Sequence, residues 1–536
     1  MVLEIELIST DIIKPSSPTP DSLRKYQLSF LDQIAPPIFM PLIYFYPADG
    51  KISHLEKSRK LKKSLSDALT RFYPLAGRVT DNFYLDCNDE GVPFFEAKAK
   101  CNLSQVISNP IPRELDKFIP YELDDIKDLG MAVQVSFFEC GGMAIALAIS
   151  HKIADALTAF FSFANGWAAI ARGDCAVAYP EFGAATIFPP RDMAGFKPST
   201  GIVKEDIVTK IFVFPNSKID ALRDKYAYTN NDGEHPVRPT RVEAVSTFIW
   251  TRFVASTDQV NKNDPNKIYT IVHAVNLRPL FDPPLSENYF GNISRLAITF
   301  PSMEDEWDRK GYGIVKQVRE AIKSINSAYL QELRQGEKHL NFMKERAAKS
   351  TRGEIITLNF TSLCRFPLYE ADFGWGKPVW IGSTSFTFKN LVTFIDTPSA
   401  RAQAVSSTIL TLLRSKWLLR SRLSGDKNLE SENVEIEHQP FNVNSVSREV
   451  LQFNFFSKTT SSVAESDVIY PRLPGLLSLE LPQYNHFQLS VKSSSSKNPV
   501  EPASTATDSE RRSYHQHRLG PYRLLEAVAP SSTMAR

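Results

Sequence analysis

The sequence predicts an α/β protein whose first 398 residues form two halves of similar size. In each half, short apolar runs typical of buried strands alternate with stretches in which apolar residues recur at helical spacing. The chain has 536 residues, of which 43% are hydrophobic and 23% charged, a globular composition that can bury a large core. These observations exclude a wholly disordered, collagen-like or coiled-coil protein.

Charge and hydropathy limit the expected partners. The chain carries 62 Lys and Arg against 60 Asp and Glu, whereas nucleic-acid binding needs a concentrated basic face. Its longest purely apolar run, Met143–Ile149, is far shorter than the ~20 residues of a membrane-spanning helix. The N-terminus carries acids at Glu4 and Glu6, where a secretory signal is basic and then apolar. We therefore expect neither nucleic acid nor a membrane as a partner.

The cysteines indicate the compartment. They are odd in number, widely spaced and without a C-x-x-C pair, so they predict neither a disulfide framework nor a zinc site. They are Cys87, Cys101, Cys140, Cys175 and Cys364. A reducing compartment fits this pattern best, and we expect a cytoplasmic protein.

The first half begins with a proline-rich segment and an amphipathic helix. Proline restrains residues 12–20 to extended or turn conformations. Apolar residues then recur at helical spacing from Leu55 to Phe72, with lysines between them. Pro74 and Gly77 predict the end of this helix.

A β-hairpin and a second helix follow. Val133–Cys140 and Met143–Ile149 are apolar runs joined by a Gly-Gly pair, which predicts two buried strands with a tight turn. Residues 157–168 return to helical spacing. Residues 150–155 therefore lie where a buried strand passes into a helix, a place at which functional side chains are commonly presented.

The second half begins after a crossover linker at about residues 171–210, where periodic signals are few. Its patterns predict strands at 211–214 and 269–276, helices at 241–255 and about 308–348, and further strands within 356–396. Residues 403–422 still have a helical pattern. The Ser-rich chain beyond them is typical of a disordered tail.

The first candidate site is the segment from Ser150 to Asp155, which contains His151. A histidine with a pKa near 6.5 at the end of a buried strand is well suited to be a general base. A hydrogen-bonded core histidine is the other interpretation, and the local sequence leaves both open. The His-x-x-x-Asp spacing also suits two metal ligands on one helix face. No third ligand with metal-like spacing lies nearby, so we expect no metal.

The second candidate is the segment Asp372-Phe-Gly-Trp-Gly376. Gly374 and Gly376 bracket Trp375, which predicts a loop with unusual backbone angles that buries a large ring. Asp372 is either a second catalytic group or an acceptor of backbone N–H bonds that holds the loop. The composition of the loop favours the holding role.

Arg278 and Cys364 complete the set of candidates. Arg278 ends an apolar run, and a buried arginine needs an acidic partner, for which Asp155 is the candidate. Cys364 has no activating neighbour, which indicates a small apolar filler rather than a nucleophile. No serine lies in a G-x-S-x-G motif, which argues against a hydrolase of that type.

Together these motifs resemble the BAHD family of plant acyl-CoA-dependent acyltransferases, and within it the alkaloid-acetylating branch. The His151-x-x-x-Asp155 motif precedes the Asp372–Gly376 loop as in that family. Four further stretches match family motifs: Leu65–Arg78, Arg241–Ser246, Asn276–Arg278 and Tyr289–Asn292. The resemblance covers residues 1–398, and the branch is indicated by residues 13–20, 28–37 and 361–366.

The resemblance implies two chloramphenicol-acetyltransferase-like domains, each a mixed β-sheet with helices, around a central solvent channel. The first domain would span residues 1–190, the crossover linker 191–210 and the second domain 211–398. Residues 399–536 would be an atypical, largely disordered extension. The strands around the Asp372 loop would pack back against the first domain.

The resemblance also implies direct transfer of an acyl group, most simply acetyl from acetyl-CoA, to the hydroxyl of an alkaloid-like alcohol. His151 would be the general base. Asp155 would pair with Arg278 and hold the turn that carries His151. Asp372 belongs to a family signature often credited with catalysis, so it is a second catalytic candidate.

Two further residues receive roles from the resemblance. Ser246 matches a position near the CoA path. Leu363 stands where many members have Trp on the acceptor side, which would reshape the acceptor pocket. Acyl-CoA and a small-molecule alcohol would be the partners, with no bound cofactor, and the family is usually monomeric.

The chain departs from the family after Pro398, because residues 399–403 no longer match. We hypothesise a C-terminus altered by a retained intron or a shifted reading frame; an uninterrupted transcript across codon 399 would contradict this. A second domain without its closing strand would expose a sheet edge. Two alternatives therefore stay open: a non-catalytic relative, or the same transfer with another acyl-CoA and a terpenoid or phenolic alcohol.

Overall fold

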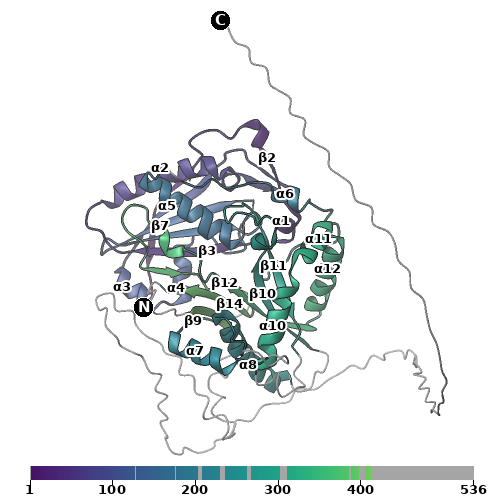
Figure 1. Cartoon of the computed structure of the whole chain (residues 1–536). Coiled ribbons are helices and arrows are strands. Elements are labelled where there is room, and N and C mark those ends of the chain that lie inside the picture. The colour runs from purple at the N-terminus through teal and green to yellow at the C-terminus, as the bar shows by residue number, and fades with distance from the viewer. Residues whose placement is uncertain are drawn as a thin grey trace, which may run out of the picture. The chain divides into compact units, whose positions relative to one another are not determined.

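The fold is described from a computed structural model of the chain (Figure 1). The structure describes residues 2–126, 128–175, 177–202, 208–229, 236–261, 267–301, 311–385, 388–397 and 405–411. All of them belong to one compact unit that spans residues 1–457. Across this part of the chain, no helix combines the length and the apolar character needed to cross a bilayer.

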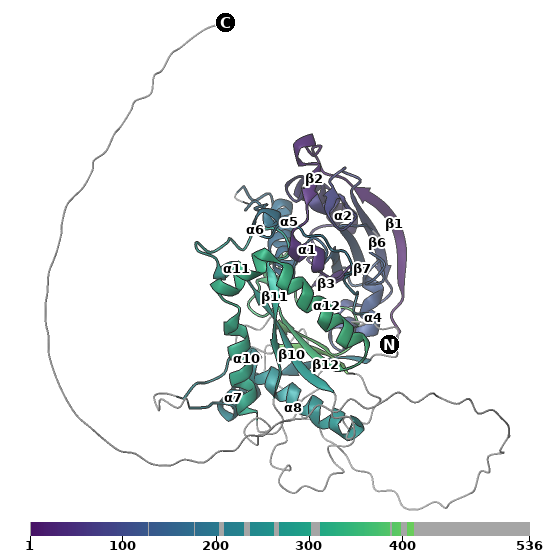
Figure 2. The ribbon, with the colours of Figure 1, turned by 90° about the vertical axis from the view of Figure 1, so that its right-hand side faces the viewer.

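Five described strands of the first half and one strand from later in the chain form a six-stranded mixed sheet, with β1 at its outer edge (Figure 2). Its order is β1 (Ile5–Ile13), β6 (Val92–Ala99), β7 (Met131–Phe138), β8 (Met143–Ser150), β3 (Phe39–Tyr46) and β13 (Trp380–Gly382). The first half also contains a separate three-stranded sheet, in the order β2 (Lys25–Gln27), β5 (Tyr84–Asp86) and β4 (Arg78–Thr80). Every residue of β7 and β8 is buried, which explains why both read as continuous apolar runs. The predicted hairpin is confirmed.

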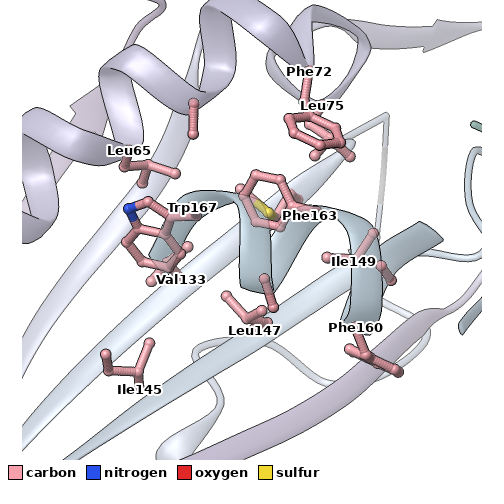
Figure 3. Packing of buried hydrophobic residues seen from close by; sticks show 14 of the residues in the cluster. Leu65, Phe72, Leu75, Val133, Ile145, Leu147, Ile149, Phe160, Phe163 and Trp167 are labelled. Atoms are coloured by element: carbon pink, nitrogen blue, oxygen red, sulfur yellow. The ribbon is translucent and has the colours of Figure 1, made fainter. Parts of the chain in front are cut away.

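Two helices cover one face of the first sheet and lie side by side: α2 (His54–Arg71) and α5 (Ala164–Arg172). Ser53 caps α2 by accepting a hydrogen bond from the Glu56 N–H. Leu65 from α2 and Trp167 from α5 interdigitate above Val133 and Leu147 of the sheet (Figure 3). The remaining helices of this half are α1 (Phe30–Ile34), α3 (Leu103–Ile107), α4 (Pro112–Leu115) and α6 (Ala184–Ile187). The helix predicted from Leu55 to Phe72 is therefore confirmed.

The helix expected at residues 157–168 forms in two parts. Leu157–Phe163 is a π-helical turn that leads into α5. A π-helical turn adds a residue to the ordinary helical repeat and is often found beside functional sites. Here it directly follows the strand-to-helix junction at residues 150–155.

The described strands of the second half form another six-stranded mixed sheet. Its order is β11 (Ser294–Thr299), β10 (Ile268–Asn276), β12 (Ile355–Ser362), β14 (Leu391–Asp396), β15 (Val405–Thr411) and β9 (Val208–Phe214). The described helices of this half are α7 (Asn216–Lys225), α8 (Arg241–Asn261), α10 (Tyr312–Ser324), α11 (Ser327–Gln335) and α12 (Glu337–Thr351). The strands and the helix α8 predicted for this half are confirmed.

The prediction of one continuous helix at about 308–348 is wrong. The structure describes α10, α11 and α12 there, with breaks at Asn326 and Gly336. The Asn326 side chain accepts hydrogen bonds from the Ala328 and Tyr329 N–H groups and starts a new helix. Gly336 has a φ of +76°, which a helix interior does not accommodate.

The helix predicted at residues 403–422 is wrong over residues 405–411, and the rest of that range lies outside the described residues. Val405–Thr411 is strand β15, which pairs antiparallel with β14 on one side and with β9 on the other. Its β-branched residues Val405, Thr408, Ile409 and Thr411 suit a strand better than a helix. The second sheet therefore contains a strand between β14 and β9. The disordered tail predicted beyond it lies outside the described residues, and the boundaries at 190, 210 and 398 stay predictions.

One strand from the second half belongs to the first sheet. Trp380–Gly382 pairs antiparallel with residues 43–45 of β3, and the Trp380 ring packs on Phe45 at a centroid distance of 5.0 Å. The expectation that the chain around the Asp372 loop packs back against the first half is confirmed. This crossing links the two sheets through one continuous stretch of chain.

Candidate active site

His151 lies directly after β8, on a turn tied to the neighbouring strand. Its backbone N–H donates to the Ile38 carbonyl at 2.8 Å, and its side chain is partly exposed. Nδ1 lies 3.1 Å from the Ala154 carbonyl oxygen. A carbonyl oxygen can only accept, so Nδ1 carries the proton. In this tautomer Nε2 is the nitrogen that can accept a proton.

The environment of His151 favours the neutral ring. Burial lowers the pKa of His151 below its ordinary value, and the negative charge of Asp155 opposes this shift without cancelling it. A neutral imidazole at neutral pH is the form that acts as a base. The geometry and the pKa of His151 therefore both suit proton abstraction.

Asp155 lies on the same turn but is bound to the second half. Its Oδ2 lies 2.8 Å from Nη1 of Arg278, and both side chains are almost fully buried. The carboxylate also accepts hydrogen bonds from the Thr158 and Ile293 N–H groups, at 2.9 and 3.1 Å. Burial alone would raise the pKa of Asp155, but the Arg278 charge and these bonds hold it below its ordinary value. The predicted partners thus meet across the two halves.

Two residues to which the sequence patterns gave no role also hold the His151 turn. The Asn292 side-chain amide donates to the His151 carbonyl oxygen and to Oδ1 of Asp32, both at 2.8 Å. Asp32 and Asn292 are buried, and Asn292 comes from the second half. Both fall inside stretches that matched family motifs, yet a motif match does not reveal which residues touch.

Asp372 holds its own loop. Its Oδ1 accepts hydrogen bonds from the Gly374 N–H at 2.7 Å and from the Gly376 N–H at 3.0 Å. Both glycines have φ values near +100°, which side-chain-bearing residues rarely adopt. Trp375 is buried beneath the loop and stacks on Phe373. This is the holding arrangement that the loop composition favoured.

The Asp372 loop lies at the far end of β3 from His151. Phe39, at one end of β3, pairs with Ser150, and Tyr46, at the other end, pairs with Met143. These ends are separated by about 23 Å of strand at ~3.3 Å per residue. The Tyr46 hydroxyl donates to the Ala371 carbonyl oxygen at 2.6 Å, which anchors the loop there. The catalytic role for Asp372 is therefore not supported by its position and stays an untested prediction.

Ser246 and Leu363 are both buried. The Ser246 hydroxyl lies 3.0 Å from Nε2 of His273, and burial lowers the pKa of His273 to about 4, so this pair is neutral. Leu363 packs in the apolar cluster that joins the Asp372 loop to the first half. The roles of Ser246 beside CoA and of Leu363 in the acceptor pocket stay predictions.

Cys364 was predicted to be a small apolar filler, and no metal site was expected. Within the described ranges, no group of three or more His, Cys, Asp or Glu side chains could hold a metal ion. Burial raises the pKa of the Cys364 thiol to about 12, and a thiol with so high a pKa is a poor nucleophile. This chemistry fits the filler role.

Comparison with known proteins identifies relatives of this chain. The model of a family described as the Transferase family matches residues 3–417. Vinorine synthase from Rauvolfia serpentina is 38% identical over 410 residues, covering 74% of this chain and 92% of that protein. Stemmadenine O-acetyltransferase from Catharanthus roseus is 36% identical, and limonoid 1-O-acetyltransferase from Citrus sinensis is 34% identical. Each of these two covers 74% of this chain and 92% of its own length.

A solved structure agrees with the sequence relatives. The crystal structure of vinorine synthase superposes with a TM-score of 0.67 at 34% identity, covering 78% of this chain and 96% of that one. The family match extends past residue 398 and includes the whole of β15. The fold, the His-x-x-x-Asp turn and the Asp372 loop thus occur in a chain whose relatives include proteins named as O-acetyltransferases.

Proposed function

The chain belongs to the Transferase family, the BAHD acyl-CoA-dependent O-acyltransferases, and on that premise we propose that it moves an acetyl group from acetyl-CoA to a hydroxyl of an alkaloid-like specialised metabolite. The observation that carries the mechanism is the hydrogen bond from Nδ1 of His151 to the Ala154 carbonyl oxygen. It leaves the Nε2 lone pair as the proton acceptor. The proposed alkaloid-like acceptor is supported by the similarity to vinorine synthase and stemmadenine O-acetyltransferase.

The proposed chemistry is a single transfer with both substrates bound. Nε2 of His151 takes the proton of the acceptor hydroxyl as its oxygen attacks the thioester carbonyl carbon. The tetrahedral intermediate collapses, the C–S bond breaks, and the CoA thiolate leaves. The imidazolium returns its proton to that thiolate, so the free base is restored. No covalent acyl-enzyme is required.

Three charged residues support this chemistry without taking part in it. Asp155 and Arg278 hold the turn that carries His151, because their ion pair joins the two halves there. We assign Asp372 to the shape of its loop, since its carboxylate accepts two glycine N–H bonds. We also propose a cytosolic monomer; the described cysteines are all unpaired, which suits a reducing compartment.

A limonoid-type terpenoid alcohol is the second candidate acceptor. The Citrus limonoid acetyltransferase is nearly as similar to this chain as the alkaloid relatives are. Leu363 stands where many family members have Trp, and under this proposal the smaller side chain would enlarge or reshape the acceptor pocket. The non-catalytic alternative was based on a damaged C-terminus, and strand β15, which pairs with β14 and β9, supports the catalytic candidate instead.

Release of CoA from acetyl-CoA tests the proposal. Wild type is assayed with panels of hydroxylated alkaloids and limonoids, beside His151→Ala and, as a control, the exposed His54→Ala. Loss of a general base typically costs about 10²- to 10⁴-fold in kcat, and we expect that loss for His151→Ala alone. Turnover that survives His151→Ala contradicts the base assignment. A folded wild type inactive with both panels contradicts the proposed acceptors.

A further inference from the structure

We propose that Lys152, the residue after the base, is a positioning residue that fixes the His151 turn to helix α1. This inference deepens the proposed function, because it takes His151 as the base. Lys152 lies between His151 and Asp155 in the sequence but has no place in the chemistry described above. It is 4% exposed, a costly position for an ammonium group unless that group is well bound.

The Lys152 ammonium is bound at the carboxyl end of α1. Nζ donates to the carbonyl oxygens of Asp32, Gln33 and Ala35, at 2.7, 2.9 and 3.2 Å. A helix leaves its last carbonyl groups without partners, and their partial negative charge favours a cation there. An ammonium group has three N–H donors, and here each has an acceptor. Among the described residues Lys152 forms no ion pair, so its binding depends on α1.

A second connection from α1 returns to the same turn. Oδ1 of Asp32 accepts hydrogen bonds from the backbone and side-chain N–H groups of Asn292, at 2.9 and 2.8 Å. The Asn292 amide in turn donates to the His151 carbonyl oxygen at 2.8 Å. The contacts form a closed ring from His151 through Lys152, Asp32 and Asn292 back to His151. The ring holds the base at its carbonyl group and at the residue that follows it, while the Ile38 carbonyl oxygen separately accepts from its N–H.

This ring explains how a turn can present a base accurately. A turn is less rigid than the middle of a helix or strand, while a small misplacement of a catalytic group can cost about 100-fold in rate. Burial lowers the pKa of Lys152 to about 7, and the negative charge of Asp32 opposes this shift. The hydrogen bonds to the three carbonyl oxygens favour the protonated form as well. Removing the ammonium should loosen the turn without touching either substrate.

Two buried lysines allow a matched test. Lys152→Met keeps the length and apolar stem of the side chain but removes the three donors. Lys57→Met removes another buried lysine of the first half, which is 1% exposed and pairs with Asp49 at 2.8 Å. Lys57 lies next to Trp375, by the Asp372 loop. Both variants lose a buried ammonium, but only one loses a contact to the His151 turn.

Steady-state kinetics give the first readout. We expect Lys152→Met to lower kcat by about 10- to 100-fold, with the KM for acetyl-CoA within about twofold of wild type. Lys57→Met should keep kcat of the folded protein within about twofold. Lys152→Gln, which retains two donors on a shorter side chain, should fall between wild type and Lys152→Met. It also serves as the test variant if Lys152→Met does not fold.

Chemical labelling gives a readout that does not depend on turnover. Diethyl pyrocarbonate modifies neutral histidines, and peptide mass spectrometry measures each histidine separately. We expect the His151 rate to rise about threefold or more in Lys152→Met because the turn is looser, with exposed His54 unchanged. Equal kcat in wild type and Lys152→Met, or an equal loss in Lys57→Met, overturns the proposal. If wild type has no turnover, the proposed function fails, and an unchanged His151 rate in Lys152→Met overturns this inference separately.

Discussion

The carboxylates of Asp155 and Asp372 accept similar hydrogen bonds in different surroundings. Asp155 and Asp372 each accept hydrogen bonds from two backbone N–H groups. Asp155 is buried and paired with Arg278 in the other half, whereas Asp372 is partly exposed and its carboxylate binds only the N–H groups of Gly374 and Gly376 among the described residues. The motif that contains Asp155 therefore joins the two halves beside His151, whereas the motif that contains Asp372 holds the shape of a distant loop.

Removing Asp155 should have the largest effect. Asp155→Ala leaves the buried Arg278 without its counter-charge, and breaking a buried pair in this way costs about 3–5 kcal/mol of unfolding free energy. Urea unfolding of the purified variants measures this loss. The control Asp86→Ala breaks an exposed pair with Arg24, which should change stability little. Equal stability of Asp155→Ala and wild type would contradict the role of the pair in joining the halves.

The same pair gives a pH dependence that sharpens the first prediction. The folded-state pKa of Asp155 lies below its ordinary value of ~3.9, because the Arg278 charge and the hydrogen bonds outweigh the effect of burial. The stabilisation is therefore complete above that ordinary value and is lost as the pH falls through the lowered pKa. The stability gap between wild type and Asp155→Ala should narrow as the pH falls in that range.

Removing Asp372 should have a smaller effect, on stability rather than on chemistry. Asp372→Ala leaves the Gly374 and Gly376 N–H groups without their acceptor, at a cost of about 1–2 kcal/mol. We expect a lower Tm and less folded protein, with kcat of the folded fraction within about twofold of wild type. Asp372→Asn, which keeps an acceptor oxygen, should lose less. Normal stability with the chemical step abolished would restore the catalytic interpretation of Asp372.

The smallest effect concerns the ionisation of His151. Burial lowers its pKa below 6.5, so the base stays neutral throughout the neutral range. The acidic limb of kcat/KM should therefore have an apparent pKa below 6.5. A profile of kcat/KM against pH measures it. An acidic limb centred above 6.5 would show that Asp155 outweighs burial.

Periodicity predicted most of the elements but not all of their breaks. The runs at β7, β8 and α2 were assigned correctly because each buries a continuous run or a regular stripe of apolar residues. The single helix expected at 308–348 is interrupted at Asn326 and Gly336. The apolar pattern continues before and after these two residues, so periodicity alone did not predict the breaks. Val405–Thr411 is a strand because β14 and β9 offer it hydrogen-bond partners on both edges, which no local pattern can reveal.

The local sequence predicts the chemical groups of this protein: a histidine at the end of a buried strand, an acid four residues later, and a loop of glycines around a buried tryptophan. These are local properties of the chain. Only the tertiary structure decided which groups meet. Asp155 and Arg278 are 123 positions apart and pair because the two halves close on each other. Lys152 binds α1 from 120 positions away. Burial turns such contacts into strong ones, since an unpaired polar group away from water is costly.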